Sequence, residues 1–156
     1  MAFEKLNSVL CVNDNDITLF ILKRTISNAN FAEKIIEKKD GSQALTYCQQ
    51  LIDTNEYQDG NYPKVIFLDL HMPVMDGWEF LDQFSTHIWP YFKETKIVIT
   101  SQSIDTSESV RASQHPFVID FHNEAMTTQY LITLQETLER ANIQDANQDL
   151  QETNAA

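Results

Sequence analysis

The chain is poor in cysteine and contains no long apolar run. Two cysteines, Cys11 and Cys48, occur among 156 residues, too few for a disulfide framework and too far apart for a metal-binding knuckle. No apolar run approaches the roughly 20 residues that cross a bilayer, and residues 1–7 lack the cationic and apolar regions of a signal peptide. These absences predict a cytoplasmic protein without a membrane partner, folded as one domain.

Basic residues are scarce as well. Eleven Lys and Arg stand against 23 Asp and Glu, which gives a formal net charge of −12. Unaided binding to nucleic acid depends largely on Lys and Arg that neutralise phosphates, so we expect no nucleic-acid partner. The last lysine of the chain is Lys96, and every later position lacks one.

The most informative segment runs from Lys64 to Phe80, where an apolar, strand-like stretch ends on Asp69. A proline, an Asp-Gly pair and a new helical pattern follow at once, which is typical of a buried central strand and the loop after it. A single Asp in this place is also explained as a turn or capping residue. In an open parallel sheet, however, Asp69 would lie at the edge where ligands and chemistry are found.

Two further strand-like stretches end on polar residues. Ser8 to Val12 leads into Asn13-Asp14-Asn15-Asp16, and Lys96 to Ile99 leads into Thr100-Ser101. The carboxyl ends of parallel strands share one sheet edge, so we expect Asp14, Asp69 and Thr100 to lie together. Thr100 has a simpler explanation too, because β-branched residues favour strands.

The rest of the chain alternates helical and strand-like patterns. We expect a helix capped by Asp16 with apolar positions at Ile17, Phe20, Ile21 and Ile26, a strand at 32–38, a helix after Asp40, a helix at 77–87, a fifth strand at 116–121 and a last helix at 124–141. Residues 103–114 have few apolar side chains, which suits a segment that moves. Five strands alternating with helices predict an α/β fold, a doubly wound parallel sheet with helices on both faces.

In the segments 9–16, 65–77 and 97–101, the sequence resembles the receiver domain of two-component response regulators. The resemblance implies a flavodoxin-like five-stranded sheet with strand order 2-1-3-4-5. It covers residues 1–141, which we assign to a receiver domain. The polar remainder, residues 142–156, has little to bury, so we expect a disordered tail.

The same resemblance assigns roles at the predicted site. Asp69 matches the phosphoacceptor, and Asp14 matches a direct ligand of Mg²⁺. His71 would supply a backbone carbonyl to the metal, and Asn13 would reach it through a water molecule. Thr100 matches the switch hydroxyl that turns toward the phosphoryl group. Mg²⁺ suits such a site because it takes oxygen ligands and offsets the negative charge that gathers when a carboxylate attacks phosphorus.

Three residues depart from the family pattern: Asn13, Phe117 and Asp120. Asn13 replaces the first acid of the metal-binding pair, so we expect weaker binding of Mg²⁺. Phe117 occupies the aromatic switch position but lacks a hydroxyl, and a permanently buried core ring explains it equally well.

Asp120 stands where receivers carry a lysine, and no lysine follows in the chain. Neighbouring carboxylates repel each other, so Asp120 would raise the proton affinity of the site or require a cation there. Either Mg²⁺ or a residue such as His122 would supply that cation, or the site is not phosphorylated.

These features predict a single-domain response regulator rather than an enzyme. We expect it to accept a phosphoryl group on Asp69 from a histidine kinase or phosphotransfer protein and to signal through protein–protein contact. One alternative is a pseudo-receiver, an interaction module that phosphorylation does not switch. A Mg²⁺-dependent aspartyl phosphatase is a weaker alternative, because Asp69-Leu70-His71 lacks the second Asp of the Asp-x-Asp pattern.

Overall fold

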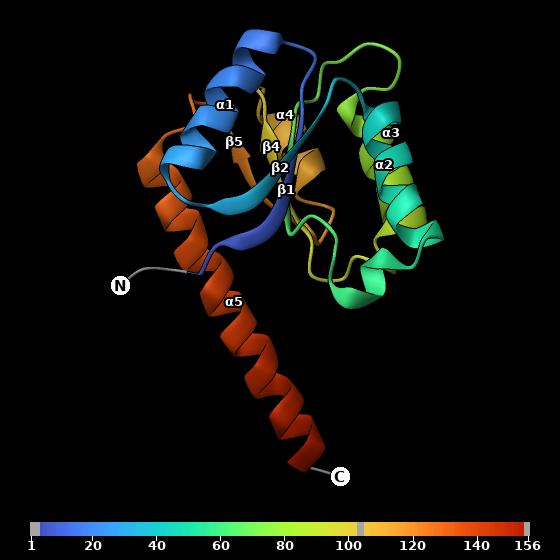
Figure 1. Cartoon of the computed structure of the whole chain (residues 1–156), viewed down its shortest axis with the longest axis vertical. Coiled ribbons are helices and arrows are strands. Elements are labelled where there is room, and N and C mark those ends of the chain that lie inside the picture. Colours follow the sequence, from blue (N-terminus) through green and yellow to red (C-terminus); the bar gives the residue numbers. More distant parts are fainter. Residues whose placement is uncertain (1–3, 103–104, 155–156) are drawn as a thin grey trace.

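The computed structural model describes residues 4–102 and 105–154 and contains one sheet of five parallel strands (Figure 1). The strands are β1 (Leu6–Val12), β2 (Ala32–Lys38), β3 (Val65–Leu68), β4 (Lys96–Thr100) and β5 (Val118–His122). Their order across the sheet is β2-β1-β3-β4-β5, which confirms the flavodoxin-like arrangement.

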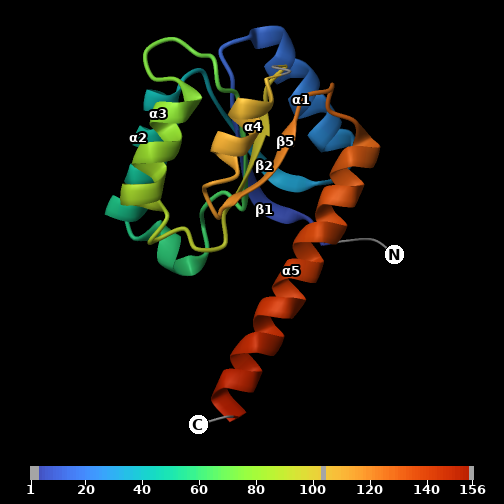
Figure 2. The ribbon, with the colours of Figure 1, turned by 180° about the vertical axis from the view of Figure 1, so that it is seen from behind.

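Helices cover both faces of this sheet, as the alternating pattern predicted (Figures 1 and 2). α1 (Asp16–Asn28) and α5 (Thr128–Asn154) pack on one face, and α2 (Gly41–Asp53), α3 (Gly77–Gln83) and α4 (Thr106–Ala112) lie on the other. A short 3-10 turn, η1 (Glu56–Asp59), follows α2. The helix expected at 77–87 is α3 continued by a wider π turn, η2 (Phe84–Ile88).

The two central strands are buried on both faces. All side chains from Val9 to Val12 and from Val65 to Leu68 are fully buried. Successive residues of a strand point to opposite faces, so these strands contribute to the cores under both helical layers. Each such side chain stabilises the fold by roughly 1.5–3 kcal/mol. The carboxyl ends of β1 and β3 are therefore the most firmly held part of the sheet edge.

Of the four apolar positions expected to face the core from the first helix, only Ile26 is buried. Leu19, Leu22 and Ile26 face the core. Three apolar residues of the expected stripe are instead exposed: Ile17 by 71%, Phe20 by 63% and Ile21 by 50%. Apolar residues occupy much of the circumference of α1, so helical spacing alone fitted both sets. The consequence is an apolar outer face on this helix.

The last helix is longer than expected. The sequence predicted its end at Ala141 and disorder from residue 142, but α5 continues as a helix to Asn154 (Figure 1). Residues 142–154 are exposed along their whole length, so the prediction that they bury little agrees with the structure while the prediction of disorder does not. Extending a helix needs no new nucleus, and Gln, Glu, Ala and Leu are good helix formers. The receiver boundary at residue 141 stays a prediction.

The fifth strand also lies differently from the expected range 116–121. The register pairs Ile97 with Val118, Val98 with Asp120, Ile99 with Phe121 and Thr100 with His122. Ile119 is therefore an extra residue, a β-bulge that the sequence pattern did not indicate. As a result His122, and not Phe121, lies opposite Thr100 at the end of the sheet, and Asp120 lies opposite Val98.

The segment expected to be weakly helical at 103–114 contains the short helix α4, in which only Ala112 is buried. Ser103 and Ile104 lie outside the described residues. Within the described ranges, no helix combines the length and apolar character needed to cross a membrane.

Candidate functional site

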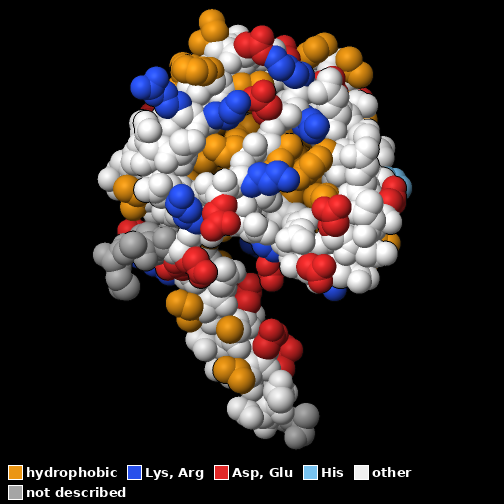
Figure 3. Space-filling view, in the orientation of Figure 1, with side chains coloured by type: hydrophobic (Ala, Val, Ile, Leu, Met, Phe, Trp, Pro, Cys, Tyr) orange, Lys and Arg blue, Asp and Glu red, His pale blue; other side chains and the backbone are white. Residues whose placement is uncertain are grey.

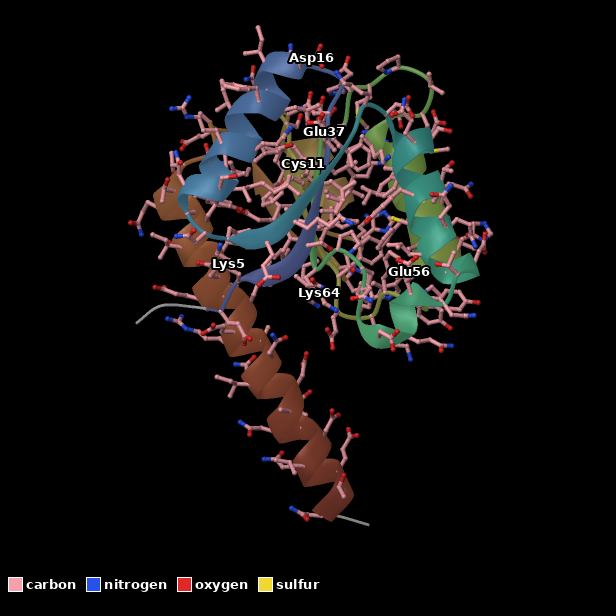
Figure 4. All side chains as sticks on the ribbon, viewed as in Figure 1. Lys5, Cys11, Asp16, Glu37, Glu56 and Lys64 are labelled. Carbon is pink, nitrogen blue, oxygen red and sulfur yellow. The ribbon has the colours of Figure 1, made fainter. Side chains whose placement is uncertain are left out.

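The ends of β1, β3 and β4 form one open cleft at the carboxyl edge of the sheet. The lining residues are Asn13, Asp14, Asn15, Thr18, Asp69, His71, Thr100, Ser101 and Gln102. Asp16, labelled near the top of Figure 4, marks this edge of the molecule, whereas Glu56 and Lys64 lie toward the opposite edge. The structure thus brings together Asp14, Asp69 and Thr100, the three residues that the strand pattern placed at one edge.

Backbone contacts hold Asp69 at the end of β3. Its N–H donates to the Val12 carbonyl at 2.9 Å, and the Leu70 N–H donates to its carboxylate at 2.9 Å. The chain returns at Gly77, whose N–H donates to the Leu70 carbonyl at 2.9 Å. A Cβ atom on Gly77 would lie 2.5 Å from the Asp69 carbonyl oxygen, so only glycine fits there. The start of α3 therefore packs directly against the backbone that carries the carboxylate.

The loop between β3 and α3 contains a tight turn at Val74. The Met75 N–H donates to the Pro73 carbonyl at 2.8 Å, and Val74 adopts a φ of 68°. This left-handed conformation is unfavourable for a β-branched residue, so the surrounding contacts must hold it. One such contact comes from the start of α2, where the Gly41 N–H donates to the Met75 carbonyl at 2.9 Å.

The turn after β1 is held by two asparagines. The buried Asn13 accepts the Asn15 N–H at 2.9 Å on its side-chain oxygen. Asn15 then caps α1 by accepting the Thr18 N–H at 3.0 Å, so the expectation that Asp16 is the cap was wrong. Asp16 instead forms an ion pair with Lys39 on the neighbouring loop. The side-chain oxygen of Asn13 thus already has a structural use within the turn.

The carboxylate of Asp69 lies in an unfavourable electrostatic setting. Partial burial is the main cause that raises its pKa, and the charge of Asp14 raises it further. The N–H groups of Leu70 and His71, together with the His71 side chain, act in the opposite direction. The net result is a raised pKa, so a cation beside the two carboxylates would stabilise their charged forms.

The two expected switch residues have very different surroundings. Thr100 lines the cleft at the end of β4. Phe117 precedes β5 and is fully buried, with its ring centroid 5.1 Å from that of Phe84 and 4.9 Å from that of Trp89. The core-ring explanation of Phe117 therefore describes its observed surroundings. Its role as a switch stays a prediction.

Asp120 does not face Asp69. Its carboxylate accepts hydrogen bonds from the Tyr130 hydroxyl on α5 and, at 2.9 Å, from the Phe121 N–H. Burial and this carboxylate raise the pKa of Tyr130, whereas Asp120 does not contribute to the shift in the pKa of Asp69. The bulge in β5 pairs Asp120 with Val98, so the Asp120 carboxylate contacts Tyr130 on α5 instead of adjoining the acid pair as the sequence predicted.

The comparisons with known proteins agree with this geometry. The family model of the response regulator receiver domain matches residues 9–118. The chain belongs to the response regulator receiver family. Response regulator Rcp1 of Synechocystis is 26% identical over 95 residues, which span 61% of each chain and so less than two thirds of that relative.

Solved receiver structures share the fold. A two-component response regulator from Cytophaga hutchinsonii has a TM-score of 0.77 and 26% identity, covering 88% of this chain and 99% of its own. The phosphorylated cyanobacterial phytochrome response regulator RcpA has a TM-score of 0.64 and 22% identity, covering 86% of this chain and 91% of its own. Receiver domains are signalling proteins, and in general they interact with kinases or phosphotransfer proteins and with downstream partners.

Receiver domains generally bind Mg²⁺, and the donors present here fit such an ion. Asp14 and Asp69 offer carboxylate oxygens in the same cleft, and Asp14 is close enough to raise the pKa of Asp69. Residues 4–102 and 105–154 contain no group of three or more His, Cys, Asp and Glu residues suited to a metal. Mg²⁺ is commonly held by only one or two carboxylates and several waters, so this small set suffices.

Sequence reasoning missed the contacts between this receiver's site and α4. The His71 Nε2 atom lies 3.5 Å from the Glu108 carboxylate, and the Arg111 guanidinium lies 4.2 Å from the centre of the Trp78 ring. Both contacts join α4 to the segment that follows β3. The partners are far apart in the sequence, and no spacing or motif connects them.

Proposed function

We propose that this receiver accepts a phosphoryl group on Asp69 from a histidine kinase or phosphotransfer protein and transmits the signal through protein contact. The observation that carries the proposal is the half-buried Asp69 carboxylate in a cleft shared with Asp14 and Thr100. Burial and the nearby Asp14 raise the pKa of this carboxylate, which supports a site where a bound cation would favour the charged form.

The reaction would be a direct transfer between two nucleophiles. An Asp69 carboxylate oxygen attacks the phosphorus of the donor's phosphohistidine, forming an acyl phosphate as the phosphorus–nitrogen bond breaks. The donor's imidazole nitrogen keeps the electron pair of the broken bond and takes a proton from water. Asp14, Asp69 and the His71 backbone carbonyl would hold Mg²⁺, with Asn13 reaching it through water. When bound, this ion offsets the negative charge around the transferred group.

Thr100 is placed to respond to the modification. Its hydroxyl lies in the same cleft as Asp69, and a phosphoryl group adds roughly −1.5 to −2 charge with three strong acceptor oxygens. Donation of a hydrogen bond from the Thr100 hydroxyl to that group would couple the site to β4. The change in surface around β4 would then be the signal that a partner protein reads.

The exposed apolar face of α1 is a suitable docking surface for the phosphodonor. Ile17, Phe20 and Ile21 lie on this helix, which begins directly beside the cleft, and hydrophobic side chains gather at this upper left part of the surface in Figure 3. The donor must bring its phosphohistidine to Asp69, so its surface has to adjoin the same cleft. An apolar contact at that point would hold it there.

One observation favours the pseudo-receiver alternative. The described lining of the cleft contains neither Lys nor Arg, and His122 at the end of β5 packs against Tyr130 with tilted rings and 4.0 Å between ring centroids. No side-chain cation other than a protonated histidine would thus neutralise a phosphoryl group there. The proposal therefore requires the metal to supply most of the positive charge.

The deciding experiment is the intact mass of the protein after incubation with acetyl phosphate and Mg²⁺. We expect one phosphoryl adduct that disappears when Mg²⁺ is withheld or when Asp69→Asn replaces the acceptor. The Asp120→Asn variant should be labelled at the rate of the parent, because Asp120 faces α5. A folded parent protein that gains no adduct from acetyl phosphate or from a panel of phosphorylated histidine domains would support the pseudo-receiver instead.

A further inference from the structure

A side-chain contact joins helix α4 to the phosphoacceptor segment. The His71 Nε2 atom lies 3.5 Å from the Glu108 Oε1 atom, and His71 lines the same cleft as Asp69. The Glu108 side chain is only 21% exposed, whereas that of His71 is 67% exposed. His71 therefore lies between two carboxylates, one at the reaction site and one on α4.

Glu108 depends strongly on this single contact. Its second oxygen, Oε2, is buried and accepts no hydrogen bond among the described residues. A buried carboxylate oxygen without a donor is unfavourable. If His71 were drawn away, Glu108 would lose its neighbouring imidazole while its Oε2 atom stayed buried, which is more unfavourable still.

The rest of α4 is weakly held. Only Ala112 of its seven residues is buried, and Val110 is 63% exposed. A second contact with the phosphoacceptor side is the Arg111 guanidinium, which lies 4.2 Å from the centre of the Trp78 ring of α3. Such a contact is weak at an exposed position. A change at Glu108 would therefore be enough to displace the helix.

Phe117 is poorly placed to move α4. Its ring is fully buried and packs against Phe84 and Trp89, so it has no exposed position from which to rotate inward. The His71–Glu108 pair offers a different connection from Asp69 to α4.

We propose that Glu108 is a positioning residue that holds His71 beside Asp69 in the resting protein and releases α4 when a phosphoryl group arrives. This inference rests on the proposed phosphorylation of Asp69. The oxygens of the phosphoryl group compete with Glu108 for the ring N–H of His71, and hydrogen bonds to such ionised acceptors are strong. Glu108 then loses its partner and becomes hydrated as α4 moves outward. Arg111 leaves the Trp78 ring in the same movement.

The test uses beryllofluoride, a phosphoryl analogue, with Mg²⁺ and a Trp89→Phe background in which Trp78 is the remaining tryptophan. Calorimetry measures binding of the analogue, and Trp78 emission reports the position of Arg111. We expect saturating analogue to change this emission in the parent background. In the Glu108→Gln variant, the emission change should be at least threefold smaller than in the parent background. A neutral amide that loses its contact with His71 has no charge to hydrate, so it does not drive α4 outward.

The affinity for beryllofluoride is a second readout, and it would not change if Glu108 had a purely structural role. In the parent, the analogue must break the His71–Glu108 pair, so by linkage Glu108→Gln should bind beryllofluoride about fivefold more tightly. The matched control is Glu79→Gln, which removes the same charge from an exposed position next to Trp78 and should behave like the parent.

The outcomes separate the two proposals. Binding of beryllofluoride with no emission change in the parent, or with equal changes and equal affinities in the parent and Glu108→Gln, would overturn the role of Glu108 alone. A parent protein that shows no binding heat with beryllofluoride and Mg²⁺ would overturn the phosphoacceptor function, and this inference with it.

Discussion

The two halves of the sheet differ in how firmly they are packed. In the half formed by β1, β3 and the start of α3, all strand residues from Val65 to Leu68 are fully buried, and Gly77 fits against Asp69 without space for a Cβ. In the half formed by α4 and β5, Ile119 bulges out of the strand and only Ala112 of α4 is buried. We call the first half, which carries the acid pair, the rigid half, and the second, in which fewer side chains are buried, the loose half.

In the proposed function, this contrast separates the chemistry from the signalling. Attack of a carboxylate on phosphorus requires fixed distances, which tightly packed strands supply. Transmission of the signal requires an element with two positions of similar free energy, and such elements are drawn from the least stable parts of a fold. Thr100 and the His71–Glu108 pair lie where the two halves meet.

The largest effect that we expect tests Phe117, a fully buried side chain at the start of the loose half. Phe117→Ala should lower the free energy of unfolding by about 3–5 kcal/mol, because it removes a fully buried ring from contact with Phe84 and Trp89. Urea unfolding followed by circular dichroism measures this change. A loss below about 1 kcal/mol would indicate that the ring spends much of its time outside the core, as a mobile switch would.

A second prediction concerns metal binding to the rigid half. At about one hundred times its dissociation constant, Mg²⁺ should raise the free energy of unfolding by about 2.7 kcal/mol, because it binds only the folded protein. Asp69→Asn and Asp14→Asn should each remove most of this stabilisation. Thermal unfolding with increasing Mg²⁺ provides the measurement, and Asp120→Asn serves as the matched control because its carboxylate faces Tyr130. Equal stabilisation of the parent and Asp69→Asn would place the metal elsewhere.

The third prediction tests how tightly the rigid half is packed. Gly77→Ala should destabilise the protein by about 1–3 kcal/mol, because its Cβ would lie 2.5 Å from the Asp69 carbonyl oxygen and 2.7 Å from the Leu70 Cα atom. Val110→Ala on α4 should change stability by less than about 0.5 kcal/mol, because Val110 is mostly exposed. Similar losses in the two variants would show that the halves do not differ in packing.

The sequence predicted the rigid half far better than the loose one. Long apolar runs that end on Asp14 and Asp69 have one reasonable structure, a buried parallel strand, and the observed strand order confirmed it. The bulge at Ile119 and the resulting direction of Asp120 arise from tertiary packing, which no local pattern encodes. The exposed face of α1 was missed for a related reason, since two apolar stripes had helical spacing. The Glu108–His71 contact joins distant segments, so only a structure could show it.

A smaller effect concerns the charge of Asp69. Burial and Asp14 raise its pKa above the ordinary value of 3.8, so the folded protein binds this proton more readily than the unfolded chain. Asp69 therefore lowers the free energy of unfolding progressively as the pH rises from about 3.8 to the higher pKa that this group has in the folded protein. At still higher pH the loss remains. Without Mg²⁺, Asp69→Asn should thus be more stable than the parent at pH 7, by about 1 kcal/mol or less because solvent screens a half-exposed group.

The measurement for that charge is urea unfolding of both proteins at several pH values between 4 and 7, with Mg²⁺ chelated. The gap in stability should widen as pH rises. A constant gap, or a less stable Asp69→Asn, would mean that the carboxylate is not strained in the free protein.

The smallest effect should come from the exposed end of α5. Residues 142–154 extend the helix into solvent and bury nothing, whereas Leu131 and Leu134 on the earlier turns lie in the core. Removal of residues 142–156 should therefore change the free energy of unfolding by less than about 0.5 kcal/mol, although the helical signal in circular dichroism falls. Leu134→Ala provides the contrast, with an expected loss of about 2–5 kcal/mol. A truncated protein that loses more than about 1 kcal/mol would show that this helical end packs against the protein in solution, and the exposed Ile143 and Leu150 would be the first side chains to substitute.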